Sequence, residues 1–172
     1  MNKQFKNGNA YLVIALLMMG ILFYSSSQTY EQQSSVPLLQ KLLSGEPFKQ
    51  SLSGIHFTYA DSPISIEDSG YFKFVEFFIR KGAHFVTYFI LGGSFFLGLN
   101  PKVKHIGISF LYAWLSATGY AAMDEFHQMI TGGRSPLFQD VMLDSSGAFF
   151  ACVVLVTYYL WINRQKGSKK KK

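Results

Sequence analysis

Four long apolar stretches run through the chain, separated by polar segments of unequal length. A helix needs about 20 predominantly apolar residues to cross the hydrocarbon core of a bilayer. The pattern predicts membrane spans at about 10–27, 80–100, 105–123 and 141–162. A soluble all-α bundle is the alternative, but its helices would be amphipathic, whereas these runs are nearly unbroken. Residues 1–172 are therefore interpreted as one all-α domain, a polytopic four-transmembrane-helix bundle.

The first two spans need a closer look than the others. Residues 10–27 are uncharged and follow two lysines, so they also fit a cleavable signal peptide. Three further apolar stretches favour a retained span. The second apolar run, 85–99, has only 15 residues, so a full crossing must extend past His84 to Arg80 and Lys81. These side chains are expected at the membrane interface or just beneath it.

The segment 28–79, between the first two spans, is rich in Ser, Gln and Gly. The run VPLLQKLL within it has the composition of a short interfacial helix. Ile55, Phe57 and Tyr59 alternate with more polar neighbours, which indicates a strand too short to stand alone. We expect this segment to be extracellular and to cover the outer face of the bundle.

The basic residues are distributed unequally about the four spans. Of the 16 Lys and Arg, ten flank the ends on one side of the membrane, and all 10 Asp and Glu lie on the other side. Cytoplasmic flanks collect Lys and Arg. We therefore expect a multi-pass protein of the cell membrane with both termini in the cytoplasm. The net charge of +6 is then a topology signal, and no nucleic-acid partner is expected.

A stripe of polar side chains marks the outer half of the second span. Arg80, His84 and Tyr88 recur every four residues and share one helix face, with Lys81 three residues before His84. Arg, Lys and Tyr also occur there as ordinary interfacial anchors. His84 is harder to explain in that way, because an ionisable group at the mouth of a span needs a partner or water.

The densest polar run ends the third span. Tyr120, Asp124 and Gln128 share a helix face, and His127 lies one turn beyond Asp124. A carboxylate, an imidazole and an amide are thus presented together. A solvated loop would have a similar composition, and that interpretation stays open.

The chain then turns into the fourth span. Gly132 and Gly133 end the third helix, which places Arg134 over the same mouth. The fourth helix opens with Asp140 and carries Asp144 on the same face, near the positive end of the helix dipole. Asp140 alone could be a helix cap. Asp144 lies about a turn deeper and is expected to pair with Arg134 or with a basic side chain of the second span.

Small residues recur at a spacing of four along the last two spans. They are Ser109, Ala113, Ala117 and Ala121 on the third, and Gly147 and Ala151 on the fourth. Small residues let membrane helices approach closely. The outer ends of the second, third and fourth helices are therefore predicted to converge and to form one site.

Three blocks of sequence resemble the VanZ-like family of membrane proteins. They are SSSQ after the first span, RKGAHFVTYFILG in the second, and DEFHQMITGGRSPLFQDVMLDSSG in the last third. The resemblance covers all four spans and is weak in segment 28–79. The matching positions are Ser26, Ser27, Gln28, Lys81, His84, Tyr88, Gly92, Asp124, Glu125, His127, Gln128, Gly133, Arg134, Asp140, Val141 and Gly147. Asp144 stands where the family often has Asn, and this extra carboxylate favours a charge-paired or cation-binding site.

The resemblance implies a cell-envelope protein connected with low-level resistance to the glycopeptide teicoplanin, through reduced drug binding at the surface. It implies no particular reaction, so enzymatic activity is left open, and the cofactors stay unknown.

We interpret the outer polar cluster as a site for an anionic lipid head group or a lipid-linked cell-wall precursor, with the lipid bilayer as the general partner. The candidate catalytic residues, which would move protons or orient water, are His84, Asp124, Glu125 and His127. The candidate ligand-binding residues are Ser27, Gln28, Arg80, Lys81, Tyr88, Gln128, Arg134, Asp140 and Asp144.

Three other interpretations stay open. The cluster could be an ion-pair network that locks a non-enzymatic structural or binding module. A transporter is less favoured, because the four spans contain no visible inverted repeat. A divalent metal held by His84, His127, Asp124 and either Asp140 or Asp144 would suit zinc chemistry. The spacing matches no compact metal motif, however, so no metal ligand is assigned.

Overall fold

The computed structural model describes residues 7–132 and 136–169. Within these residues, four helices are long and apolar enough to cross a membrane: α2 (Asn9–Ser26), α7 (Tyr71–Val103), α8 (Ile106–Gly132) and α9 (Phe138–Lys169). Large apolar side chains such as Leu16, Leu17 and Val154 are more than half exposed. Helices that are apolar on all sides are typical of membrane spans. The predicted all-α four-helix architecture is confirmed.

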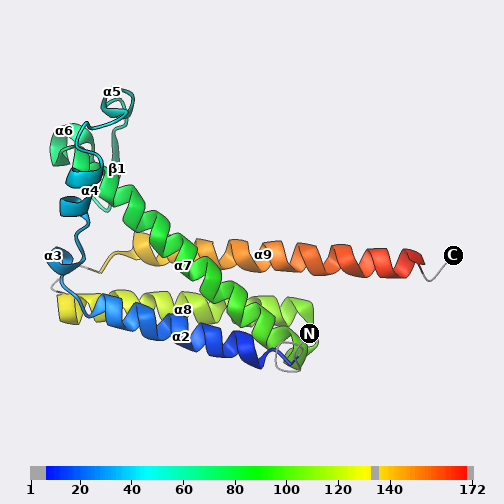
Figure 1. The fold of residues 1–172 in the computed structure, drawn as a ribbon. Helices are drawn as coiled ribbons and strands as arrows, with labels where there is room; N and C mark the ends of the chain where they lie inside the picture. Colours follow the sequence, from blue (N-terminus) through cyan, green and yellow to red (C-terminus); the bar gives the residue numbers. More distant parts are fainter. Residues whose placement is uncertain (1–6, 133–135, 170–172) are drawn as a thin grey trace.

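The four helices alternate in direction (Figure 1). One end of the bundle therefore gathers the last turns of α2 and α8 and the first turns of α7 and α9. The short elements of the chain lie at this same end, whereas α2 begins and α9 ends at the other (Figure 1). We call the first of these the cap end.

The segment between α2 and α7, residues 28–70, forms a small folded unit that we call the cap. Its predicted short helix and strand are both present, and a second strand completes an antiparallel hairpin in which Phe57 pairs with Ile64 and Tyr59 with Ser62. Its elements are α3 (Tyr30–Gln33), α4 (Val36–Leu42), α5 (Lys49–Leu52), β1 (Phe57–Tyr59), β2 (Ser62–Ile64) and α6 (Ile66–Ser69).

The cap has a small hydrophobic core of its own. Ile66, Tyr71 and Phe74 are buried there and pack against partly buried neighbours such as Leu43 and Leu52. Tyr71 and Phe74 belong to the first turns of α7. This helix therefore begins well before residue 80, where the predicted span starts, because its first turns pack against the cap.

α7 and α9 approach most closely at two glycines. A Cβ atom at Gly147 would lie 2.4 Å from the carbonyl oxygen of Phe85, and one at Gly92 would lie 2.7 Å from the Cα atom of Ala148. Real Cβ contacts essentially never fall below 3.0 Å, so only glycine allows this approach.

The predicted stripe of small residues on α8 is buried in the same bundle. The exposed fraction is 0% at Ser109, Ala113 and Ala117 and 2% at Ala121. Close packing of α7, α8 and α9 is thereby confirmed, and it brings their polar cap-end turns together.

Candidate functional site

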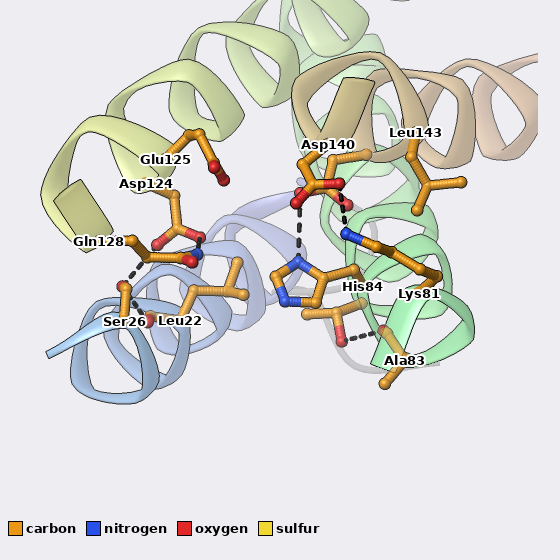
Figure 2. A network of polar contacts seen from close by, with 12 residues as sticks. Leu22, Ser26, Lys81, Ala83, His84, Asp124, Glu125, Gln128, Asp140 and Leu143 are labelled. Atoms are coloured by element: carbon orange, nitrogen blue, oxygen red, sulfur yellow. Dashed lines mark hydrogen bonds and ion pairs between the residues drawn. The ribbon is translucent and has the colours of Figure 1, made fainter. Parts of the chain in front are cut away.

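Polar side chains from all four long helices face one another at the cap end (Figure 2). Their helices bring them there from four separate parts of the chain. Those labelled in the view are Ser26 from α2, Lys81 and His84 from α7, Asp124, Glu125 and Gln128 from α8, and Asp140 from α9.

Two ion pairs link α7 to α9. Lys81 Nζ contacts Asp140 Oδ1, and His84 Nδ1 lies 3.3 Å from Asp144 Oδ2. Lys81 and His84 are one turn apart on α7, as Asp140 and Asp144 are on α9, so the two pairs form successive rungs. The prediction that Asp144 pairs with a basic side chain of the second span is confirmed.

A second group of contacts ties α8 to α2. Asp124 is 5% exposed, and each of its carboxylate oxygens accepts one hydrogen bond. Ser26 Oγ donates to Oδ1 at 2.6 Å, and Gln128 Nε2 donates to Oδ2 at 3.2 Å. His127 joins this group: its Nδ1 lies 3.4 Å from Ser26 Oγ, and its ring stacks on Phe23 with the centroids 4.3 Å apart.

Glu125 connects α8 to the start of α9. Its Oε1 accepts a hydrogen bond of 2.8 Å from the backbone amide of Leu137. The residue is buried, with an exposed fraction of 8%. Of the four candidate catalytic residues, Glu125 and His84 line the same cavity, while Asp124 and His127 lie on the α2 side. Among the described residues, no group of three or more His, Cys, Asp or Glu side chains could hold a metal ion, so the metal set considered from the sequence is not brought together.

Three further candidate ligand-binding residues differ in their exposure or lie outside the described residues. Ser27 is exposed and its Oγ donates to the Phe23 carbonyl oxygen at 2.8 Å, so its neighbour Ser26 is the serine within the cluster. Tyr88 is fully buried, and within the described part of the chain its hydroxyl group has no hydrogen-bond partner, nor has Asp144 Oδ1. Arg134 lies outside the described residues.

Glu76 is a buried carboxylate that the sequence analysis did not single out. It is 1% exposed and accepts hydrogen bonds from Tyr30 Oη at 3.0 Å, from Ser34 Oγ at 3.0 Å and from the backbone amide of Ser35. Glu76 thus holds the start of the cap against α7. The signal available in the sequence was a lone carboxylate among aromatic residues four positions before Arg80.

The hairpin of the cap closes over the α7–α9 ion pairs. Tyr59 Oη donates a hydrogen bond to Asp140 Oδ1, and Lys81 Nζ lies 4.6 Å from the centre of the Tyr59 ring. Burial raises the pKa of Tyr59 above its usual value of 10.0, and the hydrogen bond to Asp140 raises it further. The phenol therefore stays protonated and keeps its hydrogen bond through the neutral range.

Arg80 is a second cation on this part of α7, one turn from Glu76 and next to Lys81 in the sequence. Its guanidinium lies 4.7 Å from the centre of the Tyr30 ring, an aromatic contact worth about 0.5–1 kcal/mol at an exposed site. Within the described residues it makes no ion pair with a carboxylate. Arg80 is therefore a half-buried positive charge to which the described part of the chain supplies no paired carboxylate.

A cavity of about 630 Å³ lies between the cap and the ends of α7, α8 and α9. This volume falls within the usual range of small-molecule sites, about 300–1,000 Å³. The cavity is lined by Tyr30, Tyr59, Ala60, Ser62, Ile64, Ser69, Lys73, Glu76, Phe77, Arg80, Lys81, His84, Glu125, Gln128, Leu137 and Asp140.

A second cavity of about 360 Å³ adjoins the first along α2 and α7. It shares Arg80 and His84 with the larger cavity and also includes Gln28. The candidate residues thus surround two neighbouring cavities that share Arg80 and His84, with hydrogen-bonded carboxylates close by. Such an arrangement can bind an anion and can supply groups for proton transfer.

The hydrogen bond between Ser26 and Asp124 gives a direct test of the α2–α8 contact. A Ser26→Ala variant should lower the free energy of unfolding by about 1.5–3 kcal/mol, because it removes a buried hydrogen bond to a charged group. Ser27→Ala is the matched control and should change stability by less than about 0.5 kcal/mol. Thermal unfolding in detergent would measure both, and equal midpoints for the two variants would contradict this contact.

Comparison with known proteins gives one result. A family model described as VanZ/LLP1 matches residues 11–161, which include the cap and most of each long helix. No curated protein and no solved structure matches the chain significantly.

Proposed function

Because the chain belongs to the VanZ/LLP1 family and is a multi-pass membrane protein, we propose that it binds an anionic lipid head group or a lipid-linked cell-wall precursor at the cap end. Binding there would reduce the access of teicoplanin to the cell surface. The distribution of Lys and Arg supports an extracellular cap end, the side on which cell-wall precursors are exposed.

The observation that carries this proposal is the position of Arg80. Its side chain lines the cavity of about 630 Å³ and makes no ion pair with a carboxylate among the described residues. A guanidinium forms strong paired hydrogen bonds with phosphate. Lys73 lines the same cavity and adds a second positive charge.

The carboxylates nearby do not cancel this preference for an anion. Asp140 is paired with Lys81, Asp144 with His84, and Asp124 accepts hydrogen bonds from Ser26 and Gln128. Asp140 also lines the cavity, but Lys81 balances its charge, whereas Arg80 makes no ion pair with a carboxylate among the described residues. In the same proposal, His84 and Glu125 face the bound head group and are the groups placed to exchange protons with it.

An Arg80→Gln variant tests the proposal. It should retain at least about tenfold less anionic lipid, because a charged hydrogen bond is worth about 1.5–3 kcal/mol and 1.4 kcal/mol corresponds to a factor of ten. Its thermal midpoint should stay close to that of the natural chain, since no ion pair is broken. Mass spectrometry of lipids retained after purification, together with teicoplanin susceptibility of the host, would measure the effect.

Lys41→Gln is the matched control, because Lys41 is an exposed cation of the cap that does not line either cavity. It should leave lipid retention and susceptibility unchanged. A second candidate function is a purely structural ion-pair network, which the two α7–α9 pairs favour. That alternative would be supported if Arg80→Gln retained lipid and drug resistance like the natural chain.

A further inference from the structure

The smaller cavity is a groove between α2 and α7, and its two walls differ in polarity. α2 runs toward the cap and α7 runs away from it, so Gln28 and Arg80 lie nearest the cap. On α2, Leu22 and Ile21 lie farther into the membrane-spanning region, and on α7 Ala83 is followed by His84 and Thr87. The α2 wall of the groove therefore changes from polar to apolar along the direction in which a membrane lipid changes from head group to hydrocarbon.

Two polar side chains of the α7 wall already have hydrogen-bonding partners. Thr87 Oγ1 donates to the carbonyl oxygen of Ala83 at 2.7 Å, and His84 Nδ1 lies 3.3 Å from Asp144 Oδ2. A hydrocarbon chain can occupy such a wall without leaving a hydrogen-bonding group unpaired.

The groove lies at the surface that faces lipid. Ile21, one of its lining residues, is 61% exposed, and Val86, which lies between the lining residues His84 and Thr87, is 54% exposed. A chain in the groove could therefore enter sideways from the bilayer. Arg80 and His84 stand where the groove meets the larger cavity, so a phosphate held there would have hydrocarbon on one side and the head-group space on the other.

We propose that the groove between α2 and α7 holds a hydrocarbon chain of a phosphate-bearing membrane lipid, with the phosphate at Arg80 and the remaining head group in the larger cavity. This inference rests on the proposed function and adds the ligand class and its route: an intact lipid that enters from the membrane. A water-soluble phosphate ester would occupy only the Arg80 end.

Ala83 offers a way to fill the groove without changing the charged residues. It lines the groove and is labelled beside Lys81 and His84 in Figure 2. A tryptophan at this position should occupy the space of the hydrocarbon chain. Ala122→Trp is the matched control, because Ala122 is an exposed alanine of α8 that lines neither cavity.

The experiment uses the full chain in nanodiscs that contain dioleoylphosphatidylglycerol and dioleoylphosphatidylcholine. Native mass spectrometry counts the phosphatidylglycerol retained per protein, and saturation-transfer NMR follows the binding of glycerol phosphate in detergent. Ala83→Trp should retain at least about tenfold less phosphatidylglycerol, while its glycerol phosphate binding and thermal midpoint match those of the natural chain. Ala122→Trp should behave like the natural chain in every measurement.

If Ala83→Trp retained as much phosphatidylglycerol as the natural chain, the proposal that the groove holds a hydrocarbon chain would be overturned. The proposed head-group site would still stand. Equal loss of phosphatidylglycerol and glycerol phosphate in this variant would also overturn the groove proposal, because the effect would then lie at the phosphate. If the natural chain bound neither probe, the proposed function would fail and this inference with it.

Discussion

A Gly147→Leu variant should lose the close contact between α7 and α9 and unfold at a clearly lower temperature than the natural chain. The atom that a Cβ would meet 2.4 Å away is the backbone carbonyl oxygen of Phe85, which cannot rotate aside as a side chain can. Overpacking of this kind costs about 1–3 kcal/mol, and the rigid neighbour favours about 3 kcal/mol or more. Thermal unfolding in detergent would measure the loss.

The same variant should also lose the candidate site. Both ion pairs, Lys81–Asp140 and His84–Asp144, join α7 to α9, so a shift of one helix separates the partners. Gly119→Leu on α8 is the matched control, because nothing lies within 4 Å of a Cβ at Gly119. If the two variants had equal midpoints, the close crossing at Gly147 would be disproved.

The sequence predicts which side chains of the site share a helix face, because helix periodicity alone decides this. Lys81 and His84 share a face of α7, and Asp140 and Asp144 share a face of α9. Alternating helix directions place both faces at one end of the bundle. The remaining choice, which base meets which acid, depends on the offset between the helices, and sequence spacing does not contain that offset.

For the first span, periodicity does not predict which side chains face the site. Ser26 and Ser27 are neighbours at the end of α2, and the candidate ligand-binding set contained Ser27. The structure turns Ser26 toward Asp124 and leaves Ser27 exposed. A helix rotation of about 100° per residue separates these outcomes, and an apolar run without a clear polar face does not fix that rotation.

α7 extends beyond the predicted span 80–100 for a different physical reason. Membrane spans are recognised by unbroken hydrophobicity, and Glu76, Arg80 and Lys81 interrupt it. The first turns of α7 are instead stabilised by the cap, where Tyr71 and Phe74 are buried. Hydrophobicity along the sequence does not reveal such tertiary packing. It therefore indicates neither where α7 begins nor what Glu76 contacts.

Replacing Glu76 by alanine should release the start of the cap from α7. Its carboxylate accepts hydrogen bonds from Tyr30, Ser34 and Ser35, and a hydrogen bond to a charged group is worth about 1.5–3 kcal/mol. A local opening made easier by about 3 kcal/mol speeds amide hydrogen exchange by about a hundredfold. Exchange measured by mass spectrometry should therefore rise over residues 30–42.

The effect should be confined to the cap, because the contacts among α7, α8 and α9 do not involve Glu76. Glu67→Ala is the matched control, since Glu67 is an exposed carboxylate of α6, and its exchange should match that of the natural chain. Tyr30 and Arg80 line the larger cavity together, so a released cap should also weaken lipid retention at a bundle that stays folded. Unchanged exchange over residues 30–42 in Glu76→Ala would show that other contacts hold the cap, and the lipid site would then owe nothing to this carboxylate.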